Sequence, residues 1–137
     1  MTESDEFLRE ILRRCQTIAV VGISDKPDRP SHYVSAYMQA QGYRIVPVNP
    51  RFQTVLGETC YATLEDIGFK VDLVDVFRRT EDVLPVAHSA VAVGASCLWQ
   101  QMGIANQQAH ELAQAAGLQS VMNRCLKVEH ARLMMSA

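Results

Sequence analysis

The residues of this chain with the clearest chemical potential lie in one short stretch. An apolar, β-branched run over residues 17–21 ends at Gly22, and a polar loop with Lys26 and Arg29 then leads to Ser31, which opens an amphipathic segment. That order predicts a strand, a tight turn and the N-terminus of a helix. Phosphate groups bind at such a place, because the first N–H groups of a helix lack intrahelical partners and its dipole favours anions.

Further cations follow the next predicted strands, namely Arg51, Arg78 and Arg79. A ligand with several phosphates could use them, because charge-assisted hydrogen bonds are strong. The stretch lacks the second and third glycines of the G-x-G-x-x-G fingerprint, and Asn49 stands where a nicotinamide dinucleotide site normally has an acidic residue. Both departures argue against NAD. From the residues alone, NADP and coenzyme A (CoA) both remain open.

The elements that position these residues alternate along the chain. Nearly continuous apolar runs predict strands over residues 17–21, 44–48, 72–76, 97–100 and 119–122. Helical spacing and capping residues predict helices over residues 5–14, 31–41, 80–93, 106–116 and 128–134. We expect residues 51–60 to be irregular and residues 61–67 to hold a short helical turn. The pattern predicts a Rossmann-like, doubly wound α/β fold: one domain over residues 1–137, with a mostly parallel sheet of five or six strands covered on both faces.

Such a sheet binds its ligands beyond the carboxyl ends of the strands. Polar, cationic or glycine residues follow each predicted strand directly, so we expect the binding site at that edge.

The composition excludes several classes of function. The formal net charge of -2 argues against a nucleic-acid binder, and no apolar run approaches the length of a membrane span. The acidic N-terminus does not resemble a secretory signal. The four cysteines are widely spaced, which argues against a zinc site and favours reduced thiols in a cytoplasmic protein.

No catalytic arrangement is visible either. We expect surface or helix-capping roles for the four histidines, which are His32, His88, His110 and His130. Asp75 lies inside a predicted strand, where we expect a satisfied polar group and see no partner for a general base. Cys125 follows the last strand: it is either a buried, inert thiol or a disulfide partner for the thiol of CoA.

Several blocks of sequence together resemble a known family. They are Ile18-Ala-Val-Val-Gly-Ile-Ser24, Arg29-Pro-Ser31, Val46-Pro-Val-Asn-Pro50, Val71-Asp-Leu-Val-Asp-Val-Phe-Arg78, Leu98-Trp-Gln-Gln-Met-Gly103 and Asn123-Arg-Cys125. Over about residues 15–130 the chain is similar to the small stand-alone CoA-binding proteins, whose fold is like that of the N-terminal domain of the succinyl-CoA synthetase α subunit. Ile23 departs from the alanine common in that family, and Asn123 from its aspartate.

The resemblance implies a set of ligand contacts. Gly22, Ile23 and Ser24 would line the passage of the pyrophosphate and pantetheine. Lys26, Arg29 and Ser31 would lie on the phosphate side. Asn49 and Pro50 would flank the adenosine, and Phe77 and Arg78 would border the adenine pocket. Trp99, Gln100 and Gly103 would border the pantetheine arm.

It also implies a function: binding of CoA or an acyl-CoA by a non-catalytic module that acts as a carrier, a sensor or a partner subunit. Synthetase activity in the related enzymes needs a second domain, for which this sequence offers no room. An NADP-dependent oxidoreductase and a nucleotide-binding domain with a degenerate site are the alternatives. We expect no nucleic-acid or membrane partner; a protein partner is possible.

Overall fold

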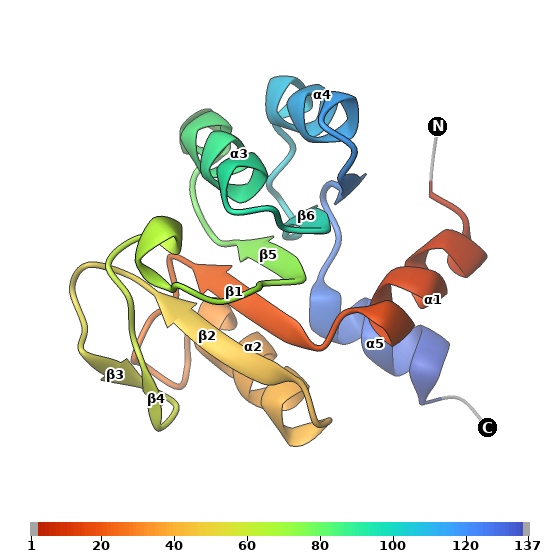
Figure 1. Ribbon diagram of the computed structural model, residues 1–137. Coiled ribbons are helices and arrows are strands. Elements are labelled where there is room, and N and C mark those ends of the chain that lie inside the picture. Colours follow the sequence, from red (N-terminus) through yellow and green to blue (C-terminus); the bar gives the residue numbers. More distant parts are fainter. Residues whose placement is uncertain (1–2, 136–137) are drawn as a thin grey trace.

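The computed structural model describes residues 3–135, and its centre is a sheet of five parallel strands (Figure 1). The strands are β1 (Thr17–Val21), β2 (Arg44–Val48), β5 (Leu73–Val76), β6 (Cys97–Gln100) and β7 (Gln119–Val121). Their order in the sheet is β2-β1-β5-β6-β7. The predicted Rossmann-like α/β fold with a parallel sheet is confirmed.

Five helices cover the two faces of the sheet. They are α1 (Asp5–Arg14), α2 (Pro30–Ala40), α3 (Val83–Ala92), α4 (Gln107–Ala115) and α5 (Leu126–Met134). Two short 3-10 turns, η1 (Leu64–Asp66) and η2 (Thr80–Asp82), complete the helical structure. In the part of the chain that the structure describes, no helix is long and apolar enough to cross a membrane.

The core has two layers because the strands are apolar on both faces. Helices α1, α2 and α5 pack on one face, where Ile18, Val20 and Trp99 lie in one buried cluster with Leu8 and Met38. Helices α3 and α4 pack on the other face, against a second buried cluster. We call these the α2 face and the α3 face.

The segment between β2 and η1 differs from the prediction. Residues 51–60 were expected to be irregular, but they form an antiparallel hairpin of β3 (Thr54–Val55) and β4 (Glu58–Thr59). Its two-residue turn places Leu56 at φ 56° and Gly57 at φ 74°. Positive φ at both central positions matches the tight turn that fits the twist of a hairpin. Leucine rarely adopts this conformation, so Leu56-Gly57 lacks the asparagine, aspartate or glycine that normally precedes the glycine in such a turn.

The order of the strands determines where a ligand can bind. The chain passes from β1 to β2 on one side and then crosses to β5 on the other side of β1. The connections on either side of β1 therefore diverge at the carboxyl ends of β1 and β5, which leaves a crevice there.

Candidate functional site

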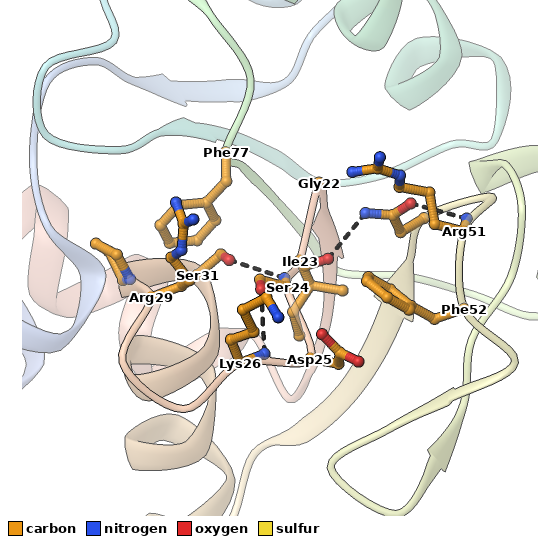
Figure 2. Close-up of a pocket in the computed structure, with 12 residues that line it drawn as sticks. Gly22, Ile23, Ser24, Asp25, Lys26, Arg29, Ser31, Arg51, Phe52 and Phe77 are labelled. Atoms are coloured by element: carbon orange, nitrogen blue, oxygen red, sulfur yellow. Dashed lines mark hydrogen bonds between the residues drawn. The ribbon is translucent and has the colours of Figure 1, made fainter.

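A cavity of about 550 Å³ lies at this crevice, on the α2 face (Figure 2). Three segments line it: the loop from β1 to α2, the residues after β2, and Phe77 after β5. Its volume lies within the range of roughly 300 to 1,000 Å³ that is usual for sites of small molecules and cofactors. The lining residues are Gly22, Ile23, Ser24, Asp25, Lys26, Arg29, Pro30, Ser31, Asn49, Arg51, Phe52 and Phe77.

The cavity depends on a close approach of two backbones at Gly22. This residue has φ +88°, and a Cβ atom added to it would lie 2.3 Å from the carbonyl oxygen of Phe77. The Gly22 N–H donates to Val48 O at 2.9 Å, and the Phe77 N–H donates to Val21 O at 2.9 Å. The three strand ends are therefore joined directly beneath the ligand space, and only glycine fits between them.

The polar loop from β1 to α2 is held in shape by its own serines. The Ser24 N–H donates to Ser31 Oγ at 2.9 Å, and the Lys26 N–H donates to Ser24 Oγ at 3.1 Å. Ser31 is 5% exposed, and its carbonyl accepts a bond from Ser35 Oγ at 2.7 Å. These bonds fix the loop across the mouth of the cavity and explain why the sequence has serines at these positions.

Helix α2 presents its N-terminus to the cavity. Pro30 occupies its first turn, and no side chain caps it. Proline suits this position because the first helical N–H has no intrahelical partner to lose. The positive end of the helix dipole therefore meets the cavity without a capping carboxylate, an arrangement that favours an anion.

Three cations line the same cavity, against one carboxylate, Asp25. Lys26, Arg29 and Arg51 are all exposed, and none of them forms a salt bridge with another described residue. In Figure 2, Arg29 and Arg51 lie on opposite sides of the turn at Gly22. The chain as a whole has a formal net charge of -2, so the positive charge is concentrated locally.

Two aromatic residues supply apolar surface. Phe52 and Phe77 both line the cavity, and both pack partly against the core cluster of the α2 face. An aromatic ring or an apolar chain of a ligand could pack on them, while its phosphates face the cations.

Asn49 joins two of the lining segments. Its Nδ2 donates to the carbonyl of Ile23 at 2.9 Å, and its Oδ1 accepts from the Arg51 N–H at 2.9 Å. The side chain therefore braces the loop after β2 against the loop after β1. Because its oxygen is already used, Asn49 is a poor substitute for the acid that accepts ribose hydroxyls in nicotinamide dinucleotide sites.

Most of the predicted contact residues lie together in this cavity, but five of them do not line it: Pro50, Arg78, Trp99, Gln100 and Gly103. Arg78 lines a separate cavity of about 170 Å³ with Val21, Val48 and Leu64. Pro50 is exposed beside Asn49.

The three residues near the end of β6 have bonds of their own. Trp99 is 0% exposed, and its indole N–H donates to Arg124 O at 2.8 Å. The Gln100 amide is buried and bonds both the N–H and the carbonyl of Asn106, at 2.7 and 3.1 Å. The Gly103 N–H donates to Asn123 Oδ1 at 2.7 Å. In this structure these contacts shape the loops of the β6–β7 edge.

Sequence reasoning did not single out Asp25, Pro30 and Phe52. They flank residues that it did select, and their types alone do not distinguish them from ordinary loop residues. The predicted role of His130 was wrong: it is 4% exposed, and its Nδ1 lies 3.0 Å from Tyr37 Oη.

Comparisons with known proteins show the family of this chain. The model of a family described as "CoA binding domain" matches residues 16–131. The chain belongs to this CoA-binding domain family.

Two similar proteins show how far the likeness extends. "Uncharacterized protein YneT" from Bacillus subtilis (strain 168) is 43% identical over 124 residues, which are 90% of this chain and 92% of that protein. A solved structure, "hypothetical protein from Pyrococcus horikoshii OT3", superposes with a TM-score of 0.93 at 40% identity, over 96% of this chain and 93% of its own.

A more distant likeness shows the same fold inside a larger enzyme. The dinucleotide-forming acetyl-coenzyme A synthetase 1 of Ca. Korarchaeum cryptofilum superposes with a TM-score of 0.71 at 23% identity. The match covers 81% of this chain and only 26% of that enzyme. At this level of identity the comparison concerns the fold alone.

Proposed function

We propose that this chain binds CoA or an acyl-CoA in the cavity at the ends of β1, β2 and β5, and that it does so as a non-catalytic module. The observation that carries the proposal is a cavity lined by the uncapped N-terminus of α2 and by three cations that form no salt bridge with another described residue. CoA carries a diphosphate and a separate ribose phosphate, so it offers as many anionic groups as the cavity offers cations.

The positions of the three cations suggest which phosphate group of CoA each of them would contact. Lys26 and Arg29 belong to the loop at the N-terminus of α2, where we place the diphosphate. Arg51 comes from the segment after β2, beside Phe52, where we place the ribose phosphate with the adenine ring on Phe52. Gln100, Trp99 and Gly103 then stay as candidates for the far end of the ligand, and Arg78 for the rim.

We propose a non-catalytic module because of the side chains that line the cavity. Neither histidine nor cysteine lines the cavity within residues 3–135, and no hydrogen bond joins Ser24 Oγ or Ser31 Oγ to the one lining carboxylate, Asp25. A hydroxyl without a neighbouring base is a weak nucleophile. We extend the proposal to a cytoplasmic carrier, sensor or partner subunit, which is consistent with four free thiols.

Isothermal titration with CoA, dephospho-CoA and NADPH tests the function. We expect CoA to bind, dephospho-CoA to bind at least tenfold more weakly, and NADPH to give no comparable signal, because a charge-assisted hydrogen bond contributes about 1.5 to 3 kcal/mol. Tight NADPH binding without a CoA signal would show the oxidoreductase alternative. A chain that binds none of the three has a degenerate site.

Single variants test the cations. Arg29→Ala should weaken CoA binding by about tenfold. Arg13→Ala is the matched control: this arginine is also exposed, but it lies on α1 and lines no part of the cavity. An unchanged affinity in Arg29→Ala removes this residue from the site.

A further inference from the structure

Asp75 is the most unusual polar residue of the core. It is 1% exposed, and its Oδ1 is the one fully buried side-chain nitrogen or oxygen atom in residues 3–135 without a hydrogen-bond partner. The sequence predicted a satisfied polar group here, and that prediction was wrong. Buried polar groups are almost always paired, so an unpaired one needs an explanation.

The Asp75 carboxyl lies on the same face of the sheet as the cavity, two residues before a residue that lines it. Asp75 pairs in register with Val20 of β1 and Trp99 of β6, both of which belong to the core of the α2 face. Side chains alternate along a strand, so the next residue of β5 on the same face is Phe77, whose Cα is roughly 7 Å further on. Phe77 lines the cavity.

A purely structural role does not account for this residue. Asp72, three positions earlier, shows what such a role looks like: its Oδ2 accepts bonds from the N–H groups of Gln16 and Thr17, at 2.9 and 3.0 Å. Asp75 caps no helix, joins no loops and forms no salt bridge with a described residue. Its presence in an apolar layer weakens the fold.

The surroundings determine what the group can do. Burial raises the pKa of the Asp75 carboxyl well above its usual range, because an apolar layer favours the neutral form over the charged one. The one titratable neighbour of Asp75 in the described core is the buried thiol of Cys97, whose pKa is raised by its own burial first and also by Cys15 and Asp75. A neutral carboxyl offers one donor and one acceptor, which suits an uncharged amide and does not suit an anion.

We propose that Asp75 determines specificity for the arm of the ligand: its free oxygen hydrogen-bonds an amide of a pantetheine chain that passes the ring of Phe77. The proposal rests on the function proposed above. In it, the cations select the phosphates and Asp75 selects an uncharged, amide-bearing arm. Phe77 is half-buried, lines the cavity and follows Asp75 on the same face of the sheet, so the proposal includes a turn of the Phe77 ring that opens a path to the carboxyl.

Two ligands distinguish the contribution of the pantetheine arm to binding from the contribution of the phosphates. CoA has the pantetheine arm, whereas adenosine 3′,5′-bisphosphate lacks it but keeps an adenine and two phosphates. Asp75→Val keeps a side chain of similar size that suits a strand, and Asp75→Asn keeps the shape and a hydrogen-bonding group. Asp72→Ala is the control, because it removes a half-buried carboxylate whose bonds are structural.

We expect Asp75→Val to melt at a higher temperature than the natural protein, to bind the bisphosphate equally well and to bind CoA about tenfold more weakly. Asp75→Asn should keep most of the CoA affinity, and it provides the binding test if the valine variant does not fold. Asp72→Ala should melt at a lower temperature with the ratio of the two affinities unchanged.

Unchanged CoA affinity in Asp75→Val overturns the inference, and so does an equal loss for both ligands, since that would trace the effect to the shape of the cavity. A natural protein that binds CoA no better than the bisphosphate also refutes it, while the proposed function stands. A natural protein that binds neither ligand refutes the proposed function itself.

Discussion

Replacement of Gly22 by alanine combines two separate penalties. At φ +88° an L-residue is strained by roughly 1 to 2 kcal/mol. The added Cβ would also lie 2.3 Å from the Phe77 carbonyl oxygen. That oxygen belongs to the backbone and cannot rotate away as a side chain would, so overpacking adds about 1 to 3 kcal/mol.

The sum, about 2 to 5 kcal/mol, is a large part of the 5 to 15 kcal/mol by which most native proteins are stable. Gly103→Ala is the matched control. Its φ is +87°, and nothing lies within 4 Å of a Cβ added there. The free energy of unfolding of this variant should therefore decrease only by the cost of the strained backbone, roughly 1 to 2 kcal/mol.

Urea denaturation followed by tryptophan fluorescence measures both variants. Trp99 is the single tryptophan and is wholly buried, so its emission reports loss of the core. We expect Gly22→Ala to be less stable than Gly103→Ala by at least about 1 kcal/mol. Equal losses in the two variants would refute the argument that the backbones at β1 and β5 approach too closely for a methyl group.

Three further predictions concern other parts of the molecule. Burial lowers the pKa of His130 from 6.5, so the unfolded chain binds a proton at a higher pH than the folded chain does. The stability of the fold should therefore decrease as the pH drops below about 6.5. In a series of melting curves at different pH values, His130→Gln should show a smaller decrease over that range. Asn106→Ala should lose about 1 kcal/mol in the same urea assay, because Asn106 Oδ1 caps α4 through the Ala109 N–H. Iodoacetamide should label the half-buried Cys125 well before the fully buried Cys97, whose pKa is raised by burial, as peptide mapping at successive times would show.

The strands and the location of the cavity could be read from the sequence because their signals are local. The run over residues 17–21 is β-branched and ends at a glycine, and the structure begins and ends β1 at the same residues. Parallel strands bring their carboxyl ends to one edge, so the polar residues after β1, β2 and β5 had to meet.

The direction of single side chains could not be read in the same way. Trp99 stands near a strand end, where a side chain can point into the core or toward solvent. The residue type does not settle which of the two occurs. Helices α1 and α5 pack over this position, so the indole is buried. The burial of His130 likewise depends on residues far away in the sequence, because the rings of Tyr37 and Tyr43 pack against it. The turn at Leu56 depends on a conformation that the residue type disfavours.

The brace formed by Asn49 has a kinetic consequence. Because it already ties the loop after β1 to the loop after β2, the half of the cavity that we propose for the phosphates is shaped before any ligand arrives. Little backbone entropy is then lost on association, and encounter is limited mainly by diffusion and by electrostatic attraction to the cations. Association should accordingly slow as ionic strength rises, while the rate at which the ligand leaves stays nearly constant.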